Sequence, residues 1–199
     1  MGPVGFDLDM TLIDSRSAIL ASFAGLSRDT GTAIDLAAVD RRLGLKLEDE
    51  LAFWYPPDQR AAAAVLYRRR YVRLAGQMTT SLPGAHEALA AVRAAGERVV
   101  IITAKHPVSV EPSLKAAGIS ADEVFTFVHG PEKAAVLSRI SAAAYVGDSP
   151  PDMAAAAQAG VRAVGVATGS FSGDDLARAG AEVVLDSLTG FPAWYGTIR

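Results

Sequence analysis

The sequence predicts an α/β protein, in which helices cover both faces of a parallel sheet and a small α-helical domain is inserted near the N-terminus. From about residue 84 onward, short apolar runs alternate with Ala-rich stretches of helical length. That alternation is typical of βαβ units and a parallel sheet. A long stretch before it has helical patterns but no β-branched run. The two patterns together predict the inserted helical domain.

Six apolar runs of strand length predict the buried sheet, because strands that are covered on both faces are apolar throughout. They span residues 4–8, 98–103, 124–128, 143–147, 161–166 and 182–185. The helices between them are expected at 84–95, 107–117, 132–140 and 151–159. Gly96, Gly118 and Gly160 each follow one of these helices, where a left-handed glycine commonly ends a helix.

The inserted domain is expected at residues 15–80, with the sheet domain formed by 1–14 and 81–199. Helical patterns inside the insert cover 16–27, 36–43, 47–54 and 58–76, and Asp58 is the expected N-cap of the last one. Residues 79–84 are interpreted as a linker. The insert holds ten Lys and Arg against seven Asp and Glu, whereas the rest holds nine against fifteen. A basic domain therefore faces an acidic one.

Composition excludes several kinds of site. The 199 residues include no Cys and three His, and the net charge is −3. These values exclude thiolate chemistry and give no support for nucleic-acid binding. No apolar run is long enough to span a membrane, and the early Asp7 and Asp9 argue against a signal peptide. A cytoplasmic monomer or homodimer that works through carboxylates is expected.

Two pairs of acids carry the strongest chemical signal. Asp7 and Asp9 follow the first apolar run, and residues two apart in a strand point to the same side. Asp148 ends another apolar run, and Asp152 lies one helical turn further on. Ligands bind at the carboxyl ends of strands in open α/β sheets. Several carboxylates there suit Mg²⁺, which often binds a substrate phosphate as well.

Four motifs, taken together and in order, resemble those of haloacid dehalogenase-like hydrolases. They are Asp7-x-Asp9-x-Thr11, Ile101-Ile102-Thr103-Ala104-Lys105, Lys133 at a helix start, and Gly147-Asp148-Ser149-x-x-Asp152. The resemblance covers nearly the whole chain, although Met10 stands where the first motif often has Gly. It implies a Rossmann-like core, and the insert is similar to the C1 helical cap of the phosphoglycolate phosphatase-like branch.

The resemblance also implies a mechanism, in which a small phosphate monoester is hydrolysed through an aspartyl-phosphate. Asp7 is then the nucleophile and Asp9 the general acid and base. Mg²⁺ is held by Asp7, the backbone carbonyl of Asp9, Asp148 and Asp152. Thr103, the backbone at Ala104 and Lys133 bind the phosphate, and Lys105 is the rival of Lys133.

The cap is expected to recognise the leaving group. Arg42 and Lys46 are the candidates for substrate contact, because a basic cap suits an anionic substrate, although a solvated helix face is an equal alternative. The arginines at 68–70 and 73 are interpreted as such a solvated face.

Other functions on the same fold stay open. A sugar phosphomutase shares the pair of acids. A phosphonatase needs a cap lysine, and Lys46 is the one lysine of the insert. A non-catalytic binding protein is a further alternative, against which the complete set of motif residues argues.

Overall fold

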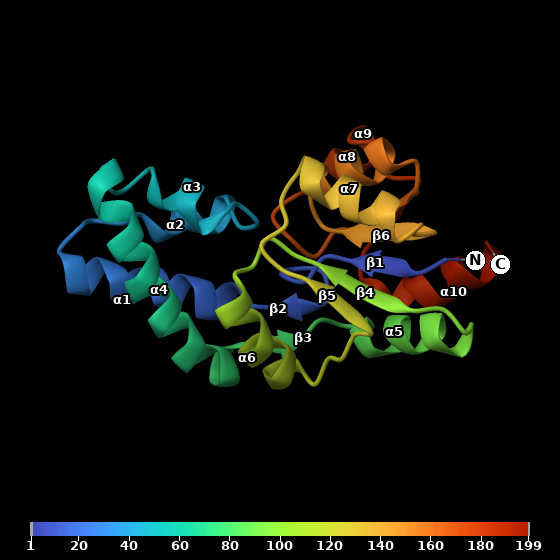
Figure 1. The fold of residues 1–199 in the computed structure, drawn as a ribbon, viewed down its shortest axis with the longest axis horizontal. Helices are drawn as coiled ribbons and strands as arrows, with labels where there is room; N and C mark the ends of the chain where they lie inside the picture. The colour runs from blue at the N-terminus through green and yellow to red at the C-terminus, as the bar shows by residue number, and fades with distance from the viewer. Residues whose placement is uncertain (1, 199) are drawn as a thin grey trace.

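The computed structural model describes residues 2–198 and contains a six-stranded sheet with the order β5-β4-β1-β6-β7-β8, in which every neighbouring pair is parallel. The strands are β1 (Val4–Phe6), β4 (Val99–Ile102), β5 (Glu123–Phe125), β6 (Ala144–Gly147), β7 (Arg162–Val166) and β8 (Val183–Leu185). The predicted α/β fold with a parallel sheet is confirmed. β1 starts at the end marked N in Figure 1 and runs toward the inserted helices.

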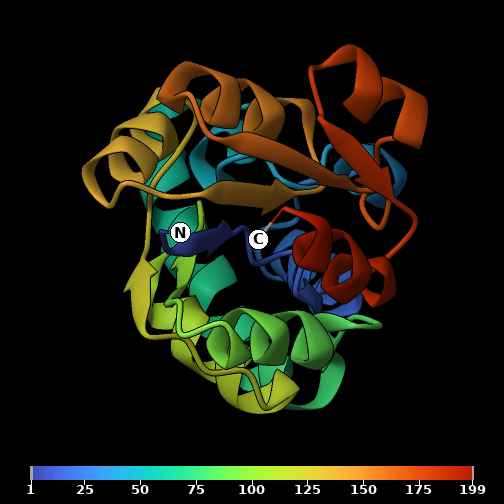
Figure 2. The same ribbon diagram turned by 90° about the vertical axis from the view of Figure 1, so that its right-hand side faces the viewer.

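Helices cover both faces of the sheet, as Figure 2 shows. They are α5 (Ala85–Ala94), α6 (Pro107–Ala117), α7 (Pro131–Arg139), α8 (Pro150–Ala159), α9 (Gly173–Arg178) and α10 (Phe191–Thr197), preceded by the 3-10 turn η1 (Leu188–Gly190). Alternate strand residues divide between the faces, because side chains along a strand point to opposite sides. Val99 and Ile101 pack with α5 and α10, whereas Val100 and Ile102 pack with α7 and α8.

The predicted strands and the four helices between them are confirmed, with ends that differ by a few residues. Gly118 and Gly160 cap their helices in the left-handed conformation, and Gly96 also has a positive φ. The short helices α9 and α10 and the turn η1 were not predicted, because six or seven residues give too little periodicity.

The insert comprises α1 (Arg16–Thr30), α2 (Leu36–Arg41), α3 (Leu47–Leu51) and α4 (Pro57–Met78), which lie beyond one end of the sheet in Figure 1. It is entered through β2 (Ile13–Asp14) and left through β3 (Thr80–Ser81), which pair antiparallel. The interpretation of 79–84 as a linker is therefore wrong for two of its residues. Two-residue strands carry no alternation that a sequence could reveal.

The expected cap at Asp58 is also wrong, because α4 begins one residue earlier, at Pro57, with Pro56 as its N-cap. Proline suits the first position of a helix, where no backbone N–H is needed. Asp58 lies in the first turn instead, where its charge still favours the positive end of the helix dipole.

The helices of the insert have a hydrophobic core of their own, which includes Phe23, Leu51 and Tyr67. The insert also contacts the sheet domain, because α4 packs along α6. There the hydroxyl groups of Tyr71 and Ser113 lie 3.0 Å apart in a buried hydrogen bond. This contact fixes α4 beside the carboxyl ends of the strands.

Among the described residues, no helix combines the length and the apolar composition that crossing a membrane requires.

A glycine next to β3 provides a test of the fold. Gly84 has a φ of +82°, and a Cβ there would lie 2.1 Å from the backbone nitrogen of Thr189. Gly96 has a φ of +76° but open space around it. We expect Gly96→Ala to lower the free energy of unfolding by about 1 kcal/mol, from backbone strain alone. Gly84→Ala should lower it by about 3 kcal/mol, because the chain at η1 must also move.

Chemical denaturation followed by circular dichroism measures both values. Equal losses in the two variants would show that the close approach at η1 contributes nothing to stability.

Candidate active site

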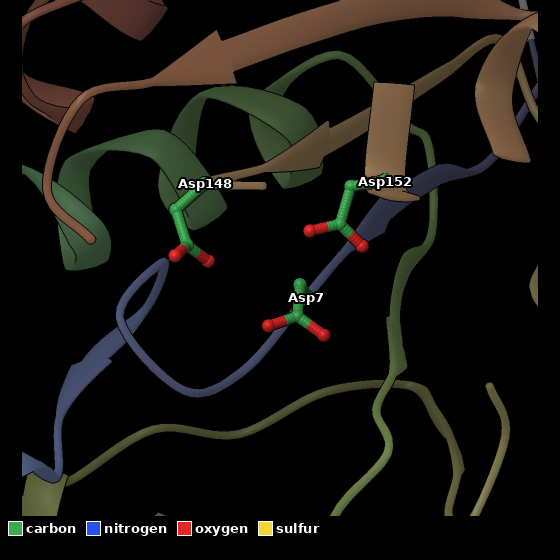
Figure 3. Close-up of side chains that lie close together, drawn as sticks. All are labelled: Asp7, Asp148 and Asp152. Atoms are coloured by element: carbon green, nitrogen blue, oxygen red, sulfur yellow. The ribbon is translucent and has the colours of Figure 1, made fainter. Parts of the chain in front are cut away.

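Three buried aspartates meet at the carboxyl ends of β1 and β6. Asp7 follows β1, Asp148 follows β6, and Asp152 lies in the first turn of α8. One carboxylate oxygen from each lies within 4.8 Å of the others, and Figure 3 shows the three side chains grouped together, with Asp7 below Asp148 and Asp152 in the view. β1 and β6 are neighbours in the sheet, so the two acids that follow them necessarily come together.

Hydrogen bonds and a close backbone approach hold these acids in place. The hydroxyl of Thr11 donates a hydrogen bond of 2.9 Å to the carboxylate of Asp148, and the backbone N–H of Asp7 donates one of 2.8 Å to the carbonyl of Val146. Gly169 passes so close to Asp148 that a Cβ there would lie 1.9 Å from the carboxylate. A side chain at position 169 would therefore displace the carboxylate of Asp148.

Lys133 is the buried cation of this cluster. Its Nζ donates hydrogen bonds of 2.7 Å to Asp7 and 2.7 Å to Asp152. Burial by itself lowers the pKa of this lysine, but the charges of Asp152 and Asp7 raise it well above its ordinary value. Lys133 is therefore a cation at neutral pH, shared between two of the three acids.

The cluster still has more negative than positive charge. Burial raises the pKa of Asp7 to about 7; Lys133 opposes this rise, and the charge of Asp152 adds to it. Burial also raises the pKa of Asp148, and the charges of Asp7 and Asp152 raise it further. A bound cation would relieve this repulsion.

Asp9 lies apart from the three acids and has its own partners. Its Oδ1 accepts hydrogen bonds of 2.5 Å from Ser15 and 2.5 Å from Lys105. The Nζ of Lys105 also lies 4.3 Å from the ring centre of Tyr71, on α4 of the insert. Lys105 therefore connects Asp9 to the insert, whereas Lys133 contacts Asp7.

The loop between Asp9 and β2 explains the unusual Met10. This residue has a φ of +61°, in the left-handed region that favours glycine. Its carbonyl accepts a hydrogen bond of 2.6 Å from Thr168, and its side chain is buried. Glycine is common at this position in similar motifs because it adopts a positive φ without strain.

Thr103 and Ala104 follow β4 and line the same cavity as the aspartates. The Thr103 hydroxyl oxygen accepts a hydrogen bond of 3.1 Å from the backbone N–H of Lys105. Its own proton remains available to donate into the cavity.

The cavity, of about 130 Å³, is closed from the other side by residues of the insert. Arg42 lines it, but its guanidinium is bound to Glu50 by hydrogen bonds of 2.8 and 2.6 Å. Lys46 is not among the lining residues.

Arg68 lines the cavity and pairs with Glu48, so the prediction that it lies on a solvated face is wrong. The helical pattern alone did not show which side of α4 faces the sheet domain.

Two residues near the acids were not singled out from the sequence as site residues. The Tyr145 hydroxyl lies 3.2 Å from Asp152, and the Ser149 hydroxyl donates a hydrogen bond of 2.5 Å to the same carboxylate. Ser149 is adjacent to Asp148 in the fourth motif and was therefore within reach of sequence reasoning. Tyr145 lies in the apolar run 143–147, and nothing in the sequence distinguishes it from the other strand residues there.

Comparison with known proteins places this geometry in a family. The sequence model described as haloacid dehalogenase-like hydrolase matches residues 4–157. The chain is 31% identical to the "Probable phosphatase IndB" of Dickeya dadantii, over 92% of this chain and 89% of the relative. It is 29% identical to a plasmid-encoded phosphoglycolate phosphatase of Cupriavidus necator, over 94% and 90%.

Solved structures show the same fold. A hydrolase from Pseudomonas syringae superposes with a TM-score of 0.84 at 22% identity, and each chain is covered completely. The family model spans most of the chain and includes Asp7, Asp9, Thr103, Lys133 and Asp148. The chain therefore belongs to the haloacid dehalogenase-like hydrolase family.

Proposed function

We propose that this phosphatase hydrolyses a small phosphate monoester with the help of Mg²⁺, through an aspartyl-phosphate on Asp7. The observation that carries the proposal is the buried group of Asp7, Asp148 and Asp152 with Lys133, beside a separate acid at Asp9. Relatives named as phosphatases support the same class of substrate.

The donor set fits Mg²⁺. Three buried carboxylates offer hard oxygen ligands, and their raised pKa values reflect a deficit of positive charge. We infer that Asp7, Asp148, Asp152 and the backbone carbonyl of Asp9 hold the metal. When bound, Mg²⁺ neutralises charge on the transferring phosphoryl group.

The residues of the chain then divide the reaction into two steps. A carboxylate oxygen of Asp7 attacks phosphorus, and the bond from phosphorus to the leaving oxygen breaks while Asp9 donates a proton to that oxygen. In the second step Asp9 accepts a proton from water. The water oxygen attacks phosphorus and releases Asp7, with inorganic phosphate as the product.

Lys133 and Thr103 are proposed to bind the phosphate. Lys133 touches Asp7 already, so a phosphoryl group on that carboxylate comes within reach of the ammonium. The Thr103 hydroxyl has a proton to donate to a phosphate oxygen. Lys105, which bonds Asp9, is proposed to position the acid rather than to bind phosphate.

Residues 15–80 are proposed to act as the cap domain, with 1–14 and 81–199 as the core. The insert closes the cavity above the acids and contributes most of its apolar lining. It would thereby exclude water and contact the leaving group.

The nucleophile is tested with Asp7→Asn. The variant should lose turnover of p-nitrophenyl phosphate with Mg²⁺ by about 10³-fold or more, because the attacking carboxylate is gone. Asp14→Asn is the matched control, since Asp14 lies in β2 and does not line the cavity. Substantial residual turnover in folded Asp7→Asn would refute the assignment.

The metal is tested by its removal. EDTA should abolish phosphate release reversibly, and added Mg²⁺ should restore it. Asp148→Asn should raise the Mg²⁺ concentration that gives half-maximal activity by about tenfold or more, because one charged ligand is lost. Turnover that persists without divalent metal would rule out this site.

The proposed roles of Lys105 and Lys133 are distinguished with two esters whose leaving groups differ. In Lys105→Met, kcat/KM should fall more for n-propyl phosphate than for p-nitrophenyl phosphate, because only the poor leaving group needs a proton from Asp9. In Lys133→Met, kcat/KM should fall by the same factor for both esters, because the lysine binds the phosphate group that they share. The opposite pattern would exchange the two roles.

A further inference from the structure

The wall of the cavity that faces the aspartates is formed by the insert and is largely apolar. Hydrophobic or aromatic side chains of this wall come from α1, α2, α3, α4 and the segment between α2 and α3. They include Ile19, Phe23, Val39, Leu43, Leu47 and Tyr67. A leaving group that enters here loses water on most of its surface. Apolar atoms gain from that change, whereas a charged group needs a partner.

Arg42, the cation expected to contact an anionic substrate, is already paired with a carboxylate of the protein. Both of its hydrogen bonds go to Glu50, which is buried and also accepts one of 2.9 Å from Trp54. The guanidinium lies over the ring of Phe53, 4.2 Å from its centre. A substrate anion would have to compete with a complete bidentate pair.

The other cations of the cavity are paired as well. Arg68 is paired with Glu48, and Lys105 with Asp9. Lys133 is paired with Asp7 and Asp152. His106 also lines the cavity, but burial and the charge of Arg68 lower its pKa, so the ring is neutral at pH 7. Among the described residues that line the cavity, each Lys and Arg therefore has a carboxylate partner.

Two buried atoms of the ion pair between Arg68 and Glu48, which both line the cavity, lack a hydrogen-bond partner within residues 2–198. The Oε2 of Glu48 and the Nε of Arg68 make no hydrogen bond among the described residues. One is an acceptor and the other a donor, so together they match a group that both donates and accepts, such as a hydroxyl or a carboxamide. The charge of Glu48 offsets that of Arg68, so this ion pair offers an anion no net positive charge.

Lys46 is a further cation of the insert, but it does not line the cavity. The pKa of His129 in the sheet domain is lowered to about 4, mainly by burial and also by the charge of Lys46. An anionic leaving group would have to reach outside the apolar wall to contact Lys46.

We propose that the substrate carries no second anionic group: its leaving alcohol is small and uncharged, with apolar surface and one neutral group that donates and accepts hydrogen bonds. This inference rests on the proposed function and names the substrate class of the same site. It opposes a preference for phosphoglycolate, even though one relative bears that name.

A pair of isosteric esters tests it directly. Phosphoglycolate and phosphoglycolamide have the same size, and they differ in a carboxylate and a carboxamide. With the full chain and Mg²⁺, kcat/KM for phosphate release should be about tenfold or more higher for the amide. n-Propyl phosphate, of similar size, should also exceed phosphoglycolate. Equal or better turnover of phosphoglycolate would overturn the inference.

Two matched variants identify the cause. Glu48→Gln removes the negative charge that offsets Arg68, so the ratio of amide to acid should fall toward one. Asp49→Asn changes the neighbouring exposed acid, which does not line the cavity, and should leave the ratio unchanged. Because each ratio compares the same two esters, differences between their leaving groups cancel. An unchanged ratio in folded Glu48→Gln would overturn the role of Glu48.

The two levels of the proposal fail differently. If no ester, including p-nitrophenyl phosphate, releases phosphate, the proposed phosphatase reaction is wrong. If esters are hydrolysed but phosphoglycolate is preferred, only the inferred substrate class is wrong. Loss of that preference in Lys46→Met would then show that Lys46 reaches the substrate.

Discussion

The repulsion among buried carboxylates is the constraint on which the rest of the site depends. Asp7, Asp148 and Asp152 are brought together by neighbouring strands, in a place where burial makes their charges costly. One lysine offsets part of that cost through two hydrogen bonds. The remainder favours a positive charge in the pocket, and a divalent cation held there would in turn attract a phosphate. The proposed chemistry thus follows from an electrostatic imbalance built into the fold.

Much of the fold and of the acidic site could be predicted from the sequence, for a simple physical reason. An acid directly after an apolar strand has no role in packing, and parallel strands end at one edge of the sheet. Asp7 and Asp148 satisfied both conditions, and their approach is observed. The strands themselves were visible because burial on both faces leaves continuous apolar runs.

Other features lay beyond sequence reasoning because they depend on the direction of side chains. Lys133 was the predicted phosphate-binding lysine and Lys105 its rival, and the geometry gives them different partners, Asp7 for Lys133 and Asp9 for Lys105. Residues 68–70 on α4 are all arginine, yet of these three only Arg68 lines the cavity. Arg42 lines the cavity, but the sequence did not show that its guanidinium is paired with Glu50.

The paired strands β2 and β3 have a consequence for how this chain can change over time. The polypeptide leaves the sheet domain and returns to it through two segments that lie side by side. The helices between them pack around a separate hydrophobic core. Under the proposed function, the chemistry and the choice of leaving group therefore depend on different stretches of the chain. Mutations in the insert would then alter which molecule is accepted, while the aspartates and the proposed reaction stay unchanged.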